Sequence, residues 1–79
     1  MDIKVLGPGC SRCQQLEKDV VNVLADMNVT ANVQKVKDIQ SIMSYKIMST
    51  PALVINEKVK VFGKVPKKDE IKKYIQEEL

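Results

Sequence analysis

Hydrophobic residues alternate with polar ones in three short stretches of the chain, and a fourth short stretch is apolar throughout. Alternation over about four to eight residues is typical of a half-buried β-strand, and a short apolar run is typical of a strand buried on both faces. The sequence therefore predicts four strands, in the ranges 2–6, 30–36, 52–55 and 59–62. The second has a polar outer face and is expected at a sheet edge, and the third is the wholly apolar one. The turn residues 56–58 join the last two as a hairpin.

Another stretch repeats apolar residues at intervals of three and four, which is the period of a helix with one buried face. This helix is expected to begin at Cys10 or Ser11 and to end near Asn28. Ser11, with Gln14 three residues later, fits a capping box at its start. Its apolar stripe comprises Leu16, Val20, Val23 or Leu24, and Met27.

Two further helices are expected in the second half of the chain. Asp38 is a favoured N-cap for a short helix, which ends before Pro51 because a residue preceding proline is driven out of the helical region. Its apolar residues are Ile39, Ile42, Met43 and Ile47. The last helix closes the chain, with Ile71, Tyr74, Ile75 and Leu79 on one face. We expect the methionines Met27, Met43 and Met48 to fill the core rather than to bind metal.

The predicted order of elements is β-α-β-α-β-β-α, which places the chain in the α/β class. The first two strands enclose a helix and should be parallel with a right-handed crossover, whereas the last two should form an antiparallel hairpin. This arrangement is a four-stranded mixed sheet flanked by three helices. With 79 residues, the chain fits one domain spanning residues 1–79.

Composition excludes several classes of function. The chain has no histidine, which removes imidazole-based acid–base catalysis and zinc sites that need imidazole. The net charge is +3, but the lysines are not interleaved with aromatic residues as a nucleic-acid surface would require. No apolar stretch approaches the roughly 20 residues of a membrane span, and the N-terminus lacks the apolar core of a signal peptide. We therefore expect a cytoplasmic protein that binds neither nucleic acid nor membrane.

The two cysteines, Cys10 and Cys13, lie where the first strand gives way to the first helix. The unpaired N–H groups and the dipole at a helix N-terminus stabilise an anion, so this position favours the thiolate of Cys10. Arg12 adds a positive charge, and Ser11 and Arg12 between the cysteines are expected to tune the redox potential. Cys13 lies one turn further into the helix. We therefore expect Cys10 to attack a disulfide in a partner, and Cys13 to release the reduced partner by attacking Cys10.

A second feature supports this chemistry. Thr50 and Pro51 precede the buried strand, and an X–Pro bond in such a tight turn can be cis. Packed beside Cys10, a cis proline would hold the backbone of Thr50 where an extended substrate chain can pair with it.

Three segments together resemble the thioredoxin-fold superfamily in its minimal form. They are residues 3–13 with the sequence IKVLGPGCSRC, residues 49–55 with STPALVI, and residues 62–64 with FGK. The chain is similar to small glutaredoxin-like thioredoxins and redox-active disulfide proteins of archaea and bacteria, over nearly its whole length. The resemblance implies that Cys10 is the nucleophile, Cys13 the resolving cysteine and Pro51 the cis proline.

The chain departs from the family pattern at three places. Gly9 replaces the tryptophan that thioredoxins typically place before the first cysteine. Lys4 stands where an ungapped count puts their buried acid, so no acid is implied at that position. The Cys-Pro-Tyr-Cys pattern of many glutaredoxins is absent, and glutathione binding is therefore not implied.

These features predict a thiol–disulfide oxidoreductase that reduces disulfides in partner proteins through the Cys10–Cys13 dithiol. We expect it to need no cofactor beyond this redox-active disulfide and no metal. Its partners would be disulfide-containing client proteins and an upstream reductase that the sequence does not identify. A monomer is expected.

A carrier of a soft metal ion such as Cu(I) is the alternative. Heavy-metal-associated domains also place a CxxC pair between a first strand and a first helix, and thiolates suit Cu(I). Those domains usually have a methionine just before the pair, where this chain has Gly7-Pro8-Gly9. They also end on a strand, whereas a helix is predicted to end this chain.

Overall fold

The computed structural model describes residues 1–9 and 11–79, so the predicted nucleophile Cys10 lies outside the described residues. Seven elements follow one another in the predicted order, which confirms the α/β class. They are β1 (Asp2–Leu6), α1 (Ser11–Met27), β2 (Asn32–Val36), α2 (Ile39–Ser44), β3 (Ala52–Ile55), β4 (Lys58–Phe62) and α3 (Lys68–Glu77).

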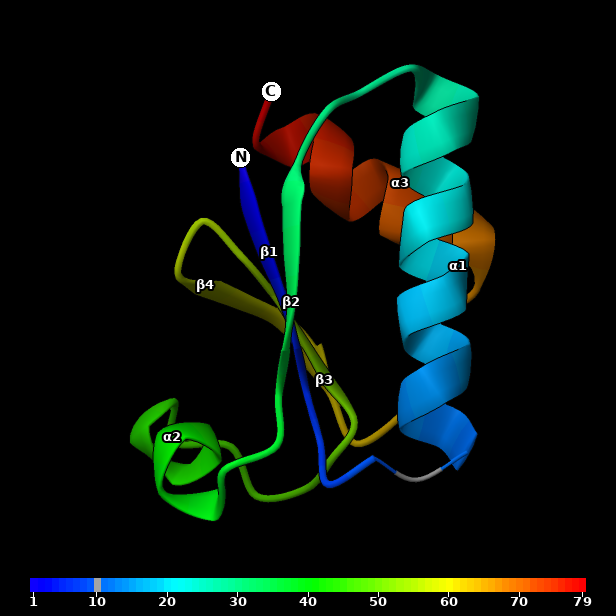
Figure 1. Cartoon of the computed structure of the whole chain (residues 1–79). Helices are drawn as coiled ribbons and strands as arrows, with labels where there is room; N and C mark the ends of the chain where they lie inside the picture. The colour runs from blue at the N-terminus through cyan, green and yellow to red at the C-terminus, as the bar shows by residue number, and fades with distance from the viewer. Residues whose placement is uncertain (10) are drawn as a thin grey trace.

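The strands form one mixed sheet in the order β2-β1-β3-β4. β1 runs parallel to β2 and antiparallel to β3, and β3 and β4 form an antiparallel hairpin. β2 is an edge strand, as its polar outer face predicted. Helices α1 and α3 cover one face of the sheet and α2 lies at the other (Figure 1). The fold is thus the predicted four-stranded mixed sheet flanked by three helices.

The main core lies between the sheet and helices α1 and α3. Alternation along β1 sends Ile3 and Val5 to this side, and Leu53 and Ile55 of β3 join them. The helices contribute the apolar residues of their inner faces, namely Leu16, Val20, Val23, Leu24, Ile71 and Ile75. Met27 and Tyr74 pack against this cluster and are partly buried. The predicted apolar stripes of α1 and α3 are confirmed, apart from Leu79, which is exposed.

The α2 side of the sheet has a much smaller core. Leu6, Ala52 and Val54 meet Ile42, which is the one buried residue of α2. Because α2 has only six residues, it turns few side chains toward the sheet. The expectation that Met43 and Met48 fill the core was wrong.

Several hydrophobic side chains of α2 and of the segment after it are exposed to solvent. Met48 is 93% exposed, and Ile39 and Met43 are each 66% exposed. Ile47 lies beyond the end of α2, although it still packs against the smaller core. The predicted apolar stripe of this helix is therefore mostly a surface feature.

Caps and turns decide where the elements begin. The Asp38 carboxylate accepts a hydrogen bond from the Ser41 backbone N–H at 3.1 Å, which confirms it as the N-cap of α2. Asn56 and Glu57 have φ angles of 51° and 66°, the pair of positive values that a tight hairpin turn needs. The capping box was wrong, because Ser11 is already the first helical residue of α1. Gln14 donates instead to the Gly9 carbonyl, at 3.3 Å.

None of the helices in residues 1–9 and 11–79 is long and apolar enough to cross a membrane.

The central strand β3 should dominate stability. Leu53→Ala removes a fully buried side chain and should lower the free energy of unfolding by ~2–5 kcal/mol. The same substitution at Leu79, which is 72% exposed, should cost less than about 0.5 kcal/mol. Urea unfolding followed by circular dichroism measures both. Equal losses in the two variants would contradict this assignment of the core.

Candidate redox site

The site is built where β1 ends and α1 begins. The Gly7 backbone N–H donates to the Val36 carbonyl at 2.9 Å, which ties the loop after β1 to the end of β2. Cys13 lies in the first turn of α1 and is 5% exposed. Cys10 directly precedes α1 in the sequence, and its own placement lies outside the described residues.

Gly7 allows Cys13 to pack directly against the loop after β1. A Cβ added to Gly7 would overlap Sγ of Cys13 and would lie 3.2 Å from its Cβ. The same atom would lie 3.9 Å from Cα of Pro51. The space that a side chain of residue 7 would need is therefore taken by the sulfur of Cys13, with the turn before β3 nearby.

The Thr50–Pro51 peptide bond is cis, as the sequence predicted, and Pro51 is buried. The Gly63 backbone N–H donates to the Pro51 carbonyl at 2.9 Å. Gly63 has a φ of +81°, and a Cβ on it would overlap Oγ of Ser49. In the sequence, Gly63 was noted only as part of the FGK segment that resembles the thioredoxin-fold superfamily. The signal available in the sequence was the place of Gly63 immediately after the strand that pairs with β3. From that place its N–H can reach the carbonyl of Pro51.

The other predicted site residues, Thr50, Ser11 and Arg12, are more exposed to solvent than Cys13 and Pro51. Thr50 is half-buried at the edge of the turn, whereas Ser11 and Arg12 are exposed on the first turn of α1. At a helix N-terminus the unpaired backbone N–H groups and the dipole together favour an anion. The structure therefore provides an anion-stabilising environment at the start of α1, with the Arg12 side chain in solvent beside it.

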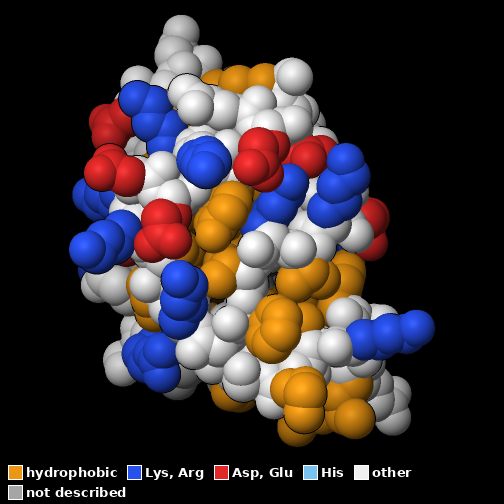
Figure 2. Space-filling model, turned by 180° about the vertical axis from the view of Figure 1, so that it is seen from behind, with side chains coloured by type: hydrophobic (Ala, Val, Ile, Leu, Met, Phe, Trp, Pro, Cys, Tyr) orange, Lys and Arg blue, Asp and Glu red, His pale blue; other side chains and the backbone are white. Residues whose placement is uncertain are grey.

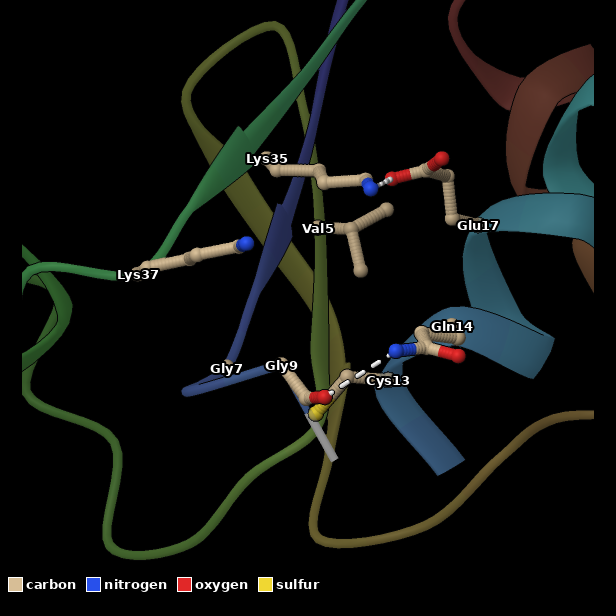
Figure 3. A pocket seen from close by; sticks show the side chains of 8 residues that line it. All are labelled: Val5, Gly7, Gly9, Cys13, Gln14, Glu17, Lys35 and Lys37. Carbon is tan, nitrogen blue, oxygen red and sulfur yellow. Dashed lines mark hydrogen bonds and ion pairs between the residues drawn. The ribbon is translucent and has the colours of Figure 1, made fainter. Parts of the chain in front are cut away.

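A pocket opens beside Cys13, between α1 and the edge of the sheet (Figure 3). It is lined by Val5, Gly7, Gly9, Cys13, Gln14, Glu17, Lys35 and Lys37. Glu17 of α1 and Lys35 of β2 form an ion pair across it, with Nζ 3.3 Å from Oε2. Sequence reasoning did not single out these two charged residues. The spacing of four between Cys13 and Glu17, which places both on one helix face, is the signal that was available.

An apolar groove lies on the other side of the site. Pro8 and Thr50 form the end nearest the cysteine loop, and the remaining lining belongs to α2 and the segment after it, namely Ile39, Ile42, Met43, Ile47, Met48 and Ser49. Figure 2 shows hydrophobic side chains gathered at the end of the molecule where α2 lies. The exposed residues of α2 are thus continuous with the turn that carries the cis proline.

Lys4 does not enter the cysteine pocket, because alternation along β1 turns it to the α2 side and turns Val5 toward Cys13. Lys4 Nζ lies 2.6 Å from Oε1 of Glu57 and 2.9 Å from the Tyr45 hydroxyl. These contacts raise the pKa of Lys4, and the hydrogen bond from Lys4 lowers the pKa of Glu57. The three side chains join α2, β1 and the hairpin turn.

Among residues 1–9 and 11–79, no three Cys, Asp or Glu side chains are grouped so that they could hold a metal ion. The last element is helix α3, as predicted.

Comparisons with known proteins agree on one family. A family model described as "Thioredoxin domain" matches residues 1–76. A protein named thioredoxin from Methanothermobacter thermautotrophicus is 32% identical over 75 residues, covering 95% of this chain and 97% of the relative. Another from Methanocaldococcus jannaschii is 27% identical over 74 residues, covering 94% and 85%. The structure of thioredoxin 1 from Thermosipho africanus superposes with a TM-score of 0.58 at 17% identity, over 99% of this chain and 98% of that one.

The contact at Gly7 can be tested by a double-mutant cycle. Gly7→Ala should lower the free energy of unfolding by about 1–3 kcal/mol, because the new methyl group meets Sγ of Cys13. In a Cys13→Ala background the sulfur is gone, and the same change should cost at least ~0.5 kcal/mol less. Denaturant unfolding of the four proteins gives the coupling energy. Additive losses would show that Gly7 and Cys13 are not in close contact.

Proposed function

Because the chain belongs to the thioredoxin domain family and is a thiol–disulfide oxidoreductase, we propose that Cys10 and Cys13 are the two cysteines that carry out its reaction. The chain has only these two cysteines. The observation that carries the proposal is the packing of buried Cys13 against Gly7, where an added Cβ would also lie 3.9 Å from Cα of Pro51 in the cis turn. That packing supports a CxxC site of the kind found in small glutaredoxin-like thioredoxins.

Cys10 acts as the nucleophile in this proposal. It immediately precedes Ser11, where α1 begins, and a sulfur at the start of a helix is favoured as a thiolate. Ser11 and Arg12 modulate its reactivity, with Arg12 adding a permanent positive charge nearby. The thiolate attacks one sulfur of a client disulfide, joins it in a mixed disulfide, and displaces the other client sulfur as a thiolate.

Cys13 acts as the resolving cysteine. Its sulfur is buried, so a folded client protein cannot reach it directly. It attacks Cys10 in the mixed disulfide, forms the Cys10–Cys13 disulfide, and releases the second client sulfur. Each cycle transfers two electrons from the dithiol to the client, and an upstream dithiol reductase must restore the reduced state.

Thr50 and Pro51 bind the client backbone in this proposal. The Pro51 carbonyl accepts the Gly63 N–H, which fixes the turn, and Thr50 borders the groove described above. An extended client segment at this turn can pair with the backbone of Thr50 as a short added strand.

The apolar groove is the surface that binds the client protein in this proposal. It begins at Pro8 and Thr50 and continues over α2, so a segment flanking the client's disulfide would enter it directly from the site. Met43 and Met48 are exposed there, and flexible thioethers adapt to many apolar partners. This supports a broad range of client proteins with apolar residues near their disulfides.

The remaining expectations belong to the same proposal. The chain works as a single domain, as a cytoplasmic monomer, and without a cofactor other than its own disulfide. Its clients are proteins with disulfide bonds.

The division of labour between the cysteines has a direct test. Cys13→Ser should trap the mixed disulfide with a protein client, because the attack that releases the client is lost. Cys10→Ser should form no mixed disulfide, because Cys13 is buried. Both variants should lose multiple turnover, and intact-mass analysis after acid quenching identifies the trapped adduct. Normal turnover by Cys13→Ser would exclude the dithiol mechanism.

The groove predicts a difference between large and small substrates. The double variant Ile39→Ser, Met43→Ser removes two exposed apolar side chains and should raise KM for a protein disulfide such as insulin roughly tenfold. Its rate with the small aromatic disulfide dithiobis(nitrobenzoate) should not change. Val21→Ser removes a half-exposed apolar side chain from α1, outside the groove, and serves as the matched control. An unchanged KM in the double variant would place client binding elsewhere.

A further inference from the structure

Helix α2 carries much of the apolar groove but has little core to hold it. It has six residues, and Ile42 is the one that is buried. The side chains of Ile39 and Met43 are exposed and line the groove. A helix this short is not stable by itself in water, so it depends on tertiary contacts. The position of α2, and with it the shape of the groove, therefore depends on further contacts with the sheet.

Lys4 provides such a contact from the centre of the sheet. β1 lies between β2 and β3, and Lys4 is in register with Gln34 on one side and Val54 on the other. Its Nζ donates to the hydroxyl of Tyr45, the C-cap residue of α2, at 2.9 Å. The same ammonium lies 5.7 Å from the centre of the Tyr45 ring. The end of α2 is thus attached to a strand that is paired on both edges.

Glu57 completes this network from the hairpin turn. Its Oε1 lies 2.6 Å from Nζ of Lys4, and its Oε2 accepts a hydrogen bond from the Tyr45 hydroxyl at 3.2 Å. The hydroxyl therefore accepts from one charged group and donates to the other. The contacts raise the pKa of Lys4 and lower the pKa of Glu57, so both groups are charged around neutral pH. Each of the three side chains contacts the other two.

The backbone of Glu57 indicates that its side chain has a role. Its φ is +66°, in the left-handed region that is unfavourable for a residue with a Cβ. Two-residue hairpin turns with two positive φ values favour Asn followed by Gly, and Asn56 fits the first position. Glycine would suit the second position better than glutamate. A residue held in an unfavourable conformation often marks a functional constraint, and the part of Glu57 that reaches distant residues is its carboxylate.

We propose that Lys4, Tyr45 and Glu57 are positioning residues that set the affinity of the chain for protein clients. This rests on the proposed function, because the client binds in the groove that α2 lines. The network fixes the end of α2 against the sheet, which holds the groove residues in the arrangement that a client meets. Lys4 lies on the opposite face of the sheet from the cysteine pocket, so the network acts on client binding rather than on disulfide exchange.

Glu57→Gly tests this directly, because it removes the carboxylate and relaxes the turn at the same time. Its urea unfolding midpoint should stay close to native, since the relaxed turn offsets the lost ion pair. Its KM for insulin should nevertheless rise roughly three- to fivefold, the scale of one partly exposed ion pair. Its kcat for insulin and its rate with dithiobis(nitrobenzoate) should not change. A purely structural role would not raise KM at native stability.

Hydrogen exchange tests the anchoring of α2 without any client. In Glu57→Gly the backbone amides of α2 should exchange roughly three- to fivefold faster than in the native protein, because the helix end is released from the sheet. The amides of β1 and β3 should keep their native rates. Nuclear magnetic resonance spectra recorded in heavy water measure both sets of rates in one experiment.

Further variants provide the controls. Lys58→Met removes a lysine from the same hairpin whose partner is Glu78, at the end of α3, and it should keep the native KM. Lys4→Met and Tyr45→Phe remove the other two members of the network and should raise KM as Glu57→Gly does. Lys4→Arg keeps the positive charge and should restore part of the affinity.

Two results would overturn the proposal. A native KM for insulin in Glu57→Gly would show that the network does not govern client binding. Native exchange rates for α2 in both Glu57→Gly and Lys4→Met would show that the network does not hold the helix. Failure of the native protein to reduce insulin would instead contradict the proposed function, and the exchange rates would still decide whether α2 is anchored.

Discussion

The close approach at Gly7 is the constraint on which the site depends. Only a residue without a side chain lets the β1–α1 loop pack directly against the sulfur of Cys13. The loop is held there by the hydrogen bond to Val36, and the proline turn is held by the hydrogen bond from Gly63. Thus the end of β2 holds the loop that packs against the sulfur, and the residue after β4 holds the turn before β3. A sheet whose strands come from the whole chain supports a site that spans only a few residues.

Alternation along β1 then gives the two sides of the molecule different tasks. Val5 faces Cys13 and the Glu17–Lys35 pair, while Lys4 faces Tyr45 and the hairpin turn. Because successive side chains of a strand point to opposite faces, neighbouring residues line the cysteine pocket on one side and anchor α2 on the other. An ungapped count along the sequence places a charge at Lys4. The structure shows that this charge is separated from the thiol by the sheet.

Much of the fold was predictable because each element carries a local signal. The apolar run of β3, the Asp38 cap and the Thr50–Pro51 turn each specify a conformation within a few residues. What sequence reasoning missed depends on contacts between distant segments. The ion pair between Glu17 and Lys35 depends on the register of β2 against β1. The exposure of Met43 depends on the shortness of α2, which packs few side chains against the sheet. Neither the ion pair nor the exposure of Met43 can be inferred from the residues that adjoin it in the sequence.

The exposed thioethers of Met43 and Met48 make this surface sensitive to oxidation. An accessible methionine is oxidised to the sulfoxide, which is polar and chiral. Met48 is 93% exposed, so peroxide reaches it without any opening of the fold. Such damage would turn an apolar surface into a polar one, and it would persist after the cysteines are reduced again. Recovery of the apolar surface would then require a methionine sulfoxide reductase.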